Sequence, residues 1–136
     1  SVRVDELCAV KSYPNVHQLV STVSADLRAG MQAWDVVGAT FPMASMTGAP
    51  KRSALRLIDA AEDMPRGLFS GSLGYQLPDG TLDLNVVIRT ITYDAFTGRA
   101  SLITGSAITA LSEPEKEWEE CELKAMSVLK ALGHVG

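Results

Sequence analysis

Cysteine is scarce in this 136-residue chain, which contains only Cys8 and Cys121. The two are far apart, neither belongs to a CxxC pair and no histidine partners them, so neither a disulfide scaffold nor a zinc site is expected. The chain also lacks an apolar run of membrane-spanning length and a charged-then-apolar leader. We therefore expect a cytoplasmic protein with two reduced, buried thiols and no membrane partner.

Basic residues are outnumbered, since 12 Lys and Arg stand against 16 Asp and Glu, for a formal net charge of −4. No basic stripe with interleaved aromatics is present, so no nucleic-acid partner is expected. GxGxxG and Walker spacings are absent, and no serine stands in the context of a nucleophile elbow. With 46% hydrophobic and 21% charged residues, the composition favours one globular domain rather than a disordered chain.

Periodicity predicts the element order ββ-αα-βββ-α. Because turns such as Pro78-Asp79-Gly80 join the strands as hairpins, we expect an α+β fold on a mainly antiparallel sheet. In the longer middle helix, Ala54, Leu57, Ile58 and Ala61 should form the buried stripe. The expected strands are 2–10, 16–23, 68–77, 82–88 and 99–109, and the expected helices are 34–41, 47–63 and 113–132, the last with a capping box of Ser112 and Glu115.

The last predicted helix carries three charged residues apart from its other charges. At about 100° per residue, Glu117, Glu120 and Lys124 form a strip beside an apolar arc that runs from Trp118 to Leu132. Two carboxylates at i and i+3 can share Mg²⁺, and Lys124 can hold an anion beside the metal. The alternative is a solvated ion pair between Glu120 and Lys124, which is more common on helices.

Two further features allow a ligand or a structural interpretation. Arg89 lies within "LNVVIRTI", on the strand face opposite Leu84, Val86 and Ile88, so it either faces solvent or binds an anion with its planar fork. The stretches "FSGSLGY" and "LITGSAIT" place glycines inside predicted strands, where a bulge or a close ligand would explain them. The residues alone thus allow an anion and Mg²⁺ cleft in an α+β domain.

Five stretches of the chain form an ordered set of motifs: "VHQLVSTV", "FPMASMTGAPK", "RGLFSGSLGYQLPDGTLDLNVVIRT", "TGSAIT" and "SEPEKEWEECELKA". Taken together and in order, they resemble the C-terminal signatures of the chorismate-utilising enzymes. This family includes anthranilate, aminodeoxychorismate, isochorismate and salicylate synthases, and the resemblance covers most of the chain.

The resemblance implies roles for the residues that match the family's motifs. Glu120 matches a glutamate that ligates Mg²⁺, and Glu117 matches one that approaches the metal, often through water. Lys124 and Arg89 match a lysine and an arginine that bind the carboxylates of chorismate. Gly105 begins the family's G-x-G turn, whose backbone N–H groups face a substrate carboxylate. A dianion held by one guanidinium fork and one metal ion makes physical sense.

The chain also departs from the family's pattern. Gln18 stands where many members carry a catalytic histidine, and Ser45 stands where anthranilate and salicylate synthases usually have threonine, so the resemblance makes both candidate catalytic residues. Phe69 replaces a tyrosine that contacts the pyruvyl carboxylate, and Ala107 replaces the second glycine of G-x-G. The motif Ser45–Lys51 with a non-tyrosine aromatic at position 69 is most similar to the aminodeoxychorismate synthase subgroup, with the anthranilate and isochorismate or salicylate subgroups as alternatives.

The resemblance further implies a larger protein around residues 1–136. The family's domain is about twice as long, so this chain is expected to be its C-terminal part. The "P-I-K-G" lysine nucleophile expected for the subgroup and another Mg²⁺ ligand would lie before residue 1. A glutamine amidotransferase is the expected partner that supplies ammonia. The isolated chain is expected to be inactive and to self-associate through exposed packing surfaces, or to act only as a ligand-binding or packing domain.

Overall fold

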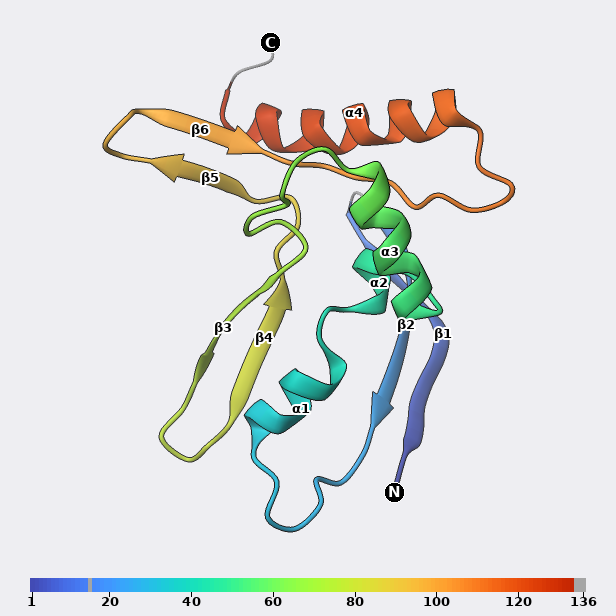
Figure 1. Ribbon diagram of the computed structural model, residues 1–136, viewed down its shortest axis with the longest axis vertical. Coiled ribbons are helices and arrows are strands. Elements are labelled where there is room, and N and C mark those ends of the chain that lie inside the picture. The colour runs from blue at the N-terminus through green and yellow to red at the C-terminus, as the bar shows by residue number, and fades with distance from the viewer. Residues whose placement is uncertain (15, 134–136) are drawn as a thin grey trace. The chain divides into compact units, whose positions relative to one another are not determined.

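The computed structural model describes residues 1–14 and 16–133 and has the predicted α+β class, with every strand pair antiparallel (Figure 1). The element order is ββ-ααα-ββββ-α, one helix and one strand more than predicted. The chain divides into two compact units, Ser1–Ala39 and Thr40–Gly136. Asn15, in the predicted turn at 12–15, lies outside the described residues. No helix in the described part is long and apolar enough to cross a membrane.

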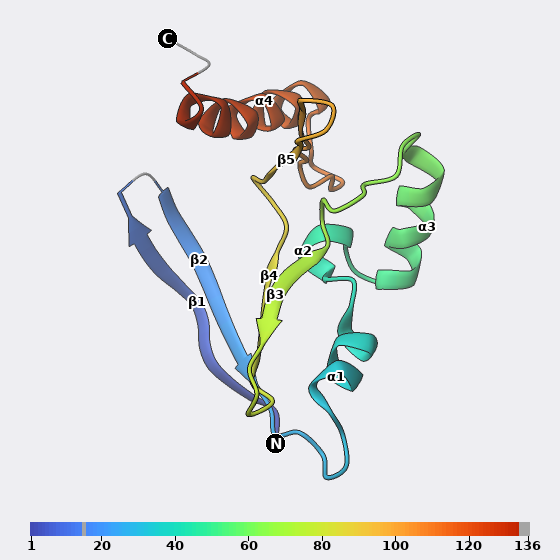
Figure 2. The same ribbon diagram turned by 90° about the vertical axis from the view of Figure 1, so that its left-hand side faces the viewer.

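The first unit is built on a two-stranded hairpin of β1, Arg3–Tyr13, and β2, Val16–Ser24 (Figure 2). The pairing shifts register near Cys8, which adopts a positive φ of 48° and whose amide donates to Ser21 Oγ at 3.0 Å. Cys8 is exposed and Cys121 only half-buried, so the prediction of buried thiols was wrong. Both residues are free thiols.

Helix α1 spans Ala33–Thr40, as the spacing of Trp34 and Val37 predicted. In the second unit α2 spans Ala44–Thr47 and α3 spans Lys51–Ala61. The inward side of α3 carries Ala54 and Ile58, as predicted, but Leu57 is 69% exposed. The half-buried residues of α3 follow the spacing i, i+3, i+4, i+7 from position 51. Lys51 and Leu55 are therefore half-buried, whereas Leu57 and Ala61, which were predicted to be buried, are exposed.

Two further hairpins follow in the second unit. Strand β3, Ser72–Gln76, pairs with β4, Leu82–Val86, through the predicted turn, in which Leu77 N donates to Thr81 O at 2.8 Å. Strand β5, Ile91–Asp94, pairs with β6, Arg99–Leu102. The predicted strand at 82–88 therefore stops at Val86, and the predicted strand at 99–109 stops at Leu102.

Burial is sparse in the described part of the chain. Only Val87, 8% exposed, and Ser70, 6% exposed, are buried. They meet where Ser70 N donates to Val87 O at 3.0 Å and Val87 N donates to Gly71 O at 2.9 Å. Large apolar side chains are exposed on every sheet, which leaves the hairpins without the packed face that a two-stranded sheet needs for stability.

Candidate functional site

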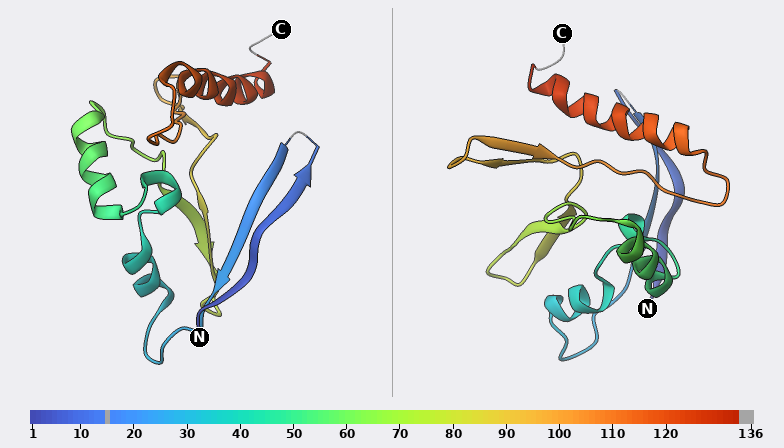
Figure 3. Two further views of the ribbon diagram at one scale, coloured as in Figure 1. Left: turned by 90° about the vertical axis from the view of Figure 1, so that its right-hand side faces the viewer. Right: turned by 45° about the horizontal axis from the view of Figure 1, so that its top comes forward.

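The C-terminal helix α4, Pro114–Ala131, turns one side toward the segment that follows β6 (Figure 3, right). Cys121, Ala125 and Val128 are half-buried on this side, whereas Trp118 is 67% exposed and lies outside the contact face. The predicted apolar arc was therefore only partly right. The helix begins after Glu113 without a side-chain cap, so the predicted capping box is not formed.

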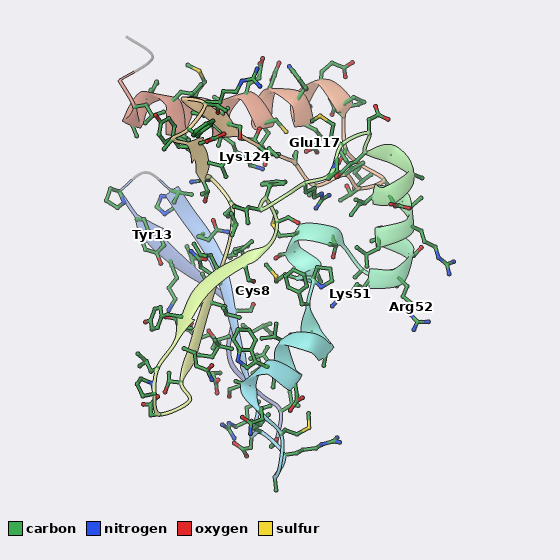
Figure 4. All side chains as sticks on the ribbon, turned by 60° about the vertical axis from the view of Figure 1, so that its left-hand side comes forward. Cys8, Tyr13, Lys51, Arg52, Glu117 and Lys124 are labelled. Carbon is green, nitrogen blue, oxygen red and sulfur yellow. The ribbon has the colours of Figure 1, made fainter. Side chains whose placement is uncertain are left out.

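Two residues of the charged strip lie on the same inward side. Figure 4 shows Glu117 and Lys124 on the underside of α4, and both are half-buried. Ser106 Oγ donates a short hydrogen bond to Glu117 Oε2. Hydrogen bonds from Ser106 and then Ser112, with the charge of Lys124, hold the pKa of Glu117 below its ordinary value. Glu117 is therefore a carboxylate at neutral pH, fixed against residues 105–107.

Lys124 connects the charged strip of α4 to the turn at residues 105–107, called the glycine loop below. Its ammonium donates to Gly105 O at 2.8 Å and forms an ion pair of 2.6 Å with Glu120 Oε1. The i,i+4 pair that the sequence allowed as the alternative is thus present, but it is not isolated in solvent, since Lys124 also contacts the loop. Positive and negative groups of α4 consequently lie beside the backbone of Gly105.

The donor set permits a hard divalent cation. No group of three or more His, Cys, Asp or Glu side chains gathers in the described residues. Glu117 and Glu120 nevertheless stand at i and i+3 on one flank of α4, and Mg²⁺ usually takes one or two protein carboxylates and completes its shell with water or substrate oxygens. The two glutamates fit as a partial Mg²⁺ site, and their role as metal ligands stays a prediction.

Phe69 also lies beside Gly105. A Cβ built on Gly105 would lie 3.5 Å from Phe69 Cζ, an ordinary contact distance. A pocket of about 320 Å³ opens beside Phe69. Its lining includes Arg66, Phe69, Val87, Thr90, Ser101 and Ile103. Phe69, Gly105 and the flank of α4 thus form one connected area, and the structure brings together five of the predicted site residues: Phe69, Gly105, Glu117, Glu120 and Lys124.

Arg89 is not within a strand, which corrects the prediction from alternation. It lies three residues beyond Val86 in a bend, is exposed and has a φ of 48°, in the left-handed region that L-residues seldom adopt. Within residues 1–14 and 16–133 its guanidinium forms neither an ion pair nor a hydrogen bond. A strained backbone at an unpaired arginine is a feature of ligand-binding positions, and its role in binding stays a prediction.

The remaining predicted residues occupy separate places. Ala107 lies one residue after Ser106, and its carbonyl accepts a hydrogen bond of 3.3 Å from Ser112 Oγ. Gln18 lies in β2 opposite Lys11, in the first unit. Ser45 lies in α2, in the second unit. The roles of Gln18 and Ser45 as catalytic residues stay predictions.

Sequence reasoning missed two residues that organise this area. Ser106 is the middle residue of the G-x-G-like turn, and only its contact with Glu117 shows its importance. Arg66 carries a bidentate ion pair with Glu62, and a pair at i and i+4 was a signal available in the sequence. Its contact with Met46 O, 20 positions away in sequence, is one that no local pattern shows.

Comparisons with known proteins agree with the resemblance. The family model described as chorismate binding enzyme matches residues 1–130. Aminodeoxychorismate synthase of Streptomyces pristinaespiralis is 46% identical over 100% of this chain and 19% of its own length. Anthranilate synthase component 1 of Aquifex aeolicus is 41% identical over 97% of this chain and 26% of its own. The crystal structure of anthranilate synthase component I from Streptococcus pneumoniae TIGR4 matches with a TM-score of 0.87 and 34% identity, over 94% of this chain and 29% of that one.

Proposed function

Because the chain belongs to the family of chorismate binding enzymes, we propose that it supplies the C-terminal part of the active site of an aminodeoxychorismate synthase. The intact protein would convert chorismate and ammonia into 4-amino-4-deoxychorismate, a precursor of para-aminobenzoate and folate. One observation carries the choice of reaction. The first five curated relatives all have aminodeoxychorismate synthase in their names. The chain spans less than a fifth of each of them, so the activity is proposed for the whole protein.

The charges around the glycine loop suit a dianionic substrate. The ammonium of Lys124 contacts both Gly105 O and Glu120 Oε1, so a substrate carboxylate bound beside Gly105 would lie close to a positive charge. Arg89 has no partner in the described part of the chain. Its planar guanidinium can donate two parallel hydrogen bonds to the second carboxylate. Phe69 and Gly105, which lie in contact range of each other, would form one wall of the substrate site, with Ala107 at the end of the turn.

Glu117 and Glu120 would hold Mg²⁺ in this arrangement. When bound, the metal supplies Lewis-acid assistance to the departure of the ring hydroxyl. The hydrogen bond from Ser106 keeps Glu117 ionised and oriented, and Lys124 balances the charge of Glu120. These contacts preorganise two anionic side chains before any ligand is present, which reduces the cost of ordering them on binding.

Other parts of the proposal depend on residues outside this area. Gln18 and Ser45 match family positions by resemblance, and we propose them as catalytic residues of the intact protein. Ammonia would come from a glutamine amidotransferase subunit or domain. The nucleophilic lysine implied by the family resemblance has no equivalent among residues 1–136, so this chain alone is expected to be inactive. The cytoplasmic location follows only from composition and stays a prediction.

The runner-up is anthranilate synthase, because the Aquifex relative and the pneumococcal structure carry that name. Product analysis separates the candidates. The intact protein should be incubated with chorismate, ammonia and Mg²⁺, and the ring position of the new amino group determined by NMR. Amination at position 4 supports the proposal, amination at position 2 supports anthranilate synthase, and an unaminated isochorismate or salicylate supports the third subgroup. Full retention of chorismate would contradict all three.

A further inference from the structure

The side chain of Arg66 joins three segments of the second unit. Its Nε and Nη2 atoms donate to both carboxylate oxygens of Glu62, at 2.7 and 2.5 Å, at the end of α3. Its remaining nitrogen, Nη1, donates to Met46 O in α2 at 2.8 Å and to Ser70 Oγ at 3.1 Å. The fork on Glu62 fixes the plane of the guanidinium, and this plane then sets where Met46 and Ser70 lie.

Two of these three segments lead to residues of the proposed site. Met46 follows Ser45 directly in α2. The guanidinium carbon lies 6.0 Å from the centroid of the Phe69 ring, within the range of a cation–π contact. The same ring is the one in contact range of Gly105. Arg66 therefore contacts the same ring that lies beside Gly105.

The segment that contains Ser70 also leads to Arg89. Ser70 is buried and has a positive φ of 66°, a conformation that needs support from its neighbours. Its hydroxyl accepts from Arg66, and its amide donates to Val87 O at 3.0 Å. Val87 precedes Arg89 by two residues. Hydrogen bonds that begin at Arg66 and pass through Ser70 therefore fix the backbone at the start of the bend that contains Arg89.

We propose that Arg66 is a positioning residue of the active site, which holds the Phe69 ring against Gly105 and fixes the backbone that carries Arg89 and Ser45. This inference rests on the proposed function only for the identity of the substrate, chorismate. The positioning of Phe69 and of the neighbouring backbone by Arg66 does not depend on it. Arg66 touches neither the glutamates of α4 nor the glycine loop in any hydrogen bond, and it acts through Phe69, Ser70 and Met46. Lysine cannot replace it fully, because an ammonium lacks the planar fork.

The test uses the intact protein that contains this chain, with Arg66→Ala, Arg66→Lys and the control Arg52→Ala. Arg52 extends from α3 into solvent in Figure 4 and has no ion pair among the described residues. Two quantities are measured: KM and kcat for chorismate, and amide hydrogen exchange of peptides over 66–71, 86–90 and α4 without substrate. Arg66→Ala should raise KM by about 10- to 100-fold with a smaller change in kcat, and should speed exchange at 66–71 and 86–90 but not in α4. Arg66→Lys should recover part of both effects, and Arg52→Ala should match the wild type.

Two results would overturn the inference. One is an Arg66→Ala variant that matches Arg52→Ala in KM and in exchange, and the other is faster exchange spread evenly over all peptides with an unchanged KM. If Arg66→Ala does not fold, Glu62→Gln takes its place, since it weakens the fork and leaves Arg66 its bonds to Met46 and Ser70. If the intact wild type does not consume chorismate, the proposed function fails, and the local pattern of exchange alone then supports or refutes the positioning role.

Discussion

Substitution of Arg89 separates substrate binding from backbone strain. Arg89 has a φ of 48°, and the left-handed region costs an L-residue about 1 to 2 kcal/mol. Glycine removes this cost but adds roughly 0.5 to 1 kcal/mol of chain entropy in the unfolded state, whereas alanine keeps the strain. Arg89→Gly should therefore be more stable than Arg89→Ala by about 1 kcal/mol, measured by urea unfolding of the intact protein.

Both substitutions remove the same guanidinium and should affect catalysis equally. A bidentate, charge-assisted contact with a carboxylate contributes about 2 to 3 kcal/mol, so kcat/KM for chorismate should fall by about 30- to 150-fold in both variants. Arg52→Ala, which removes a solvent-exposed arginine of α3, should keep kcat/KM near the wild-type value. Unchanged kcat/KM in both Arg89 variants would remove this residue from the site, and equal stabilities of the two variants would refute the strain argument.

Three further predictions concern the fold and the loop under α4. Gly74→Ala should destabilise the protein by about 3 kcal/mol or more in urea unfolding, because a Cβ would lie 1.8 Å from Asp83 O. Gly105→Ala meets only an ordinary contact and should unfold like the wild type. Equal losses of stability in the two variants would contradict this prediction. The pKa of Glu117 is lowered in the folded state, so its contribution to stability is present above the unfolded pKa and is lost as pH falls through the folded pKa. Acid unfolding of Ser106→Ala should therefore show a weaker pH dependence than that of the wild type. Identical acid unfolding curves would exclude the hydrogen bond between Ser106 and Glu117. The 136-residue chain alone should self-associate in sedimentation experiments and leave chorismate unchanged, because so few of its described apolar side chains are buried; a monomer with turnover would refute this.

Local patterns predicted the hairpins β1–β2 and β3–β4 and the helices α1, α3 and α4, but not β5 or α2. The turn at 77–81 and the strands β2 and β4 follow from alternation and from turn residues, which act within a few positions of each other. The strip on α4 was also visible, because Glu117 and Lys124 project from the helix by its own geometry. What periodicity could not give was the depth of burial, since that depends on which surfaces pack against each element.

The failures come from contacts between residues distant in sequence. The strand predicted through Arg89 breaks because Val87 bonds to Ser70 and Gly71, which lie 16 or more positions earlier. No alternation signals the positive φ that follows. The role of Arg66 was missed for the same reason, because its pair with Glu62 looks like an ordinary surface pair until the contact with Met46, 20 positions away, is seen.

The central claim is that Glu117 and Glu120 of α4 hold a divalent cation beside an anion site. The most direct measurement is a Mg²⁺ titration by calorimetry of the intact protein and of Glu120→Gln, with Glu119→Gln as the control, since Glu119 is an exposed neighbour on the same helix. We expect Glu120→Gln to weaken Mg²⁺ binding by about 10-fold or more and Glu119→Gln to bind as the wild type does. Wild-type Mg²⁺ affinity in Glu120→Gln would contradict the claim.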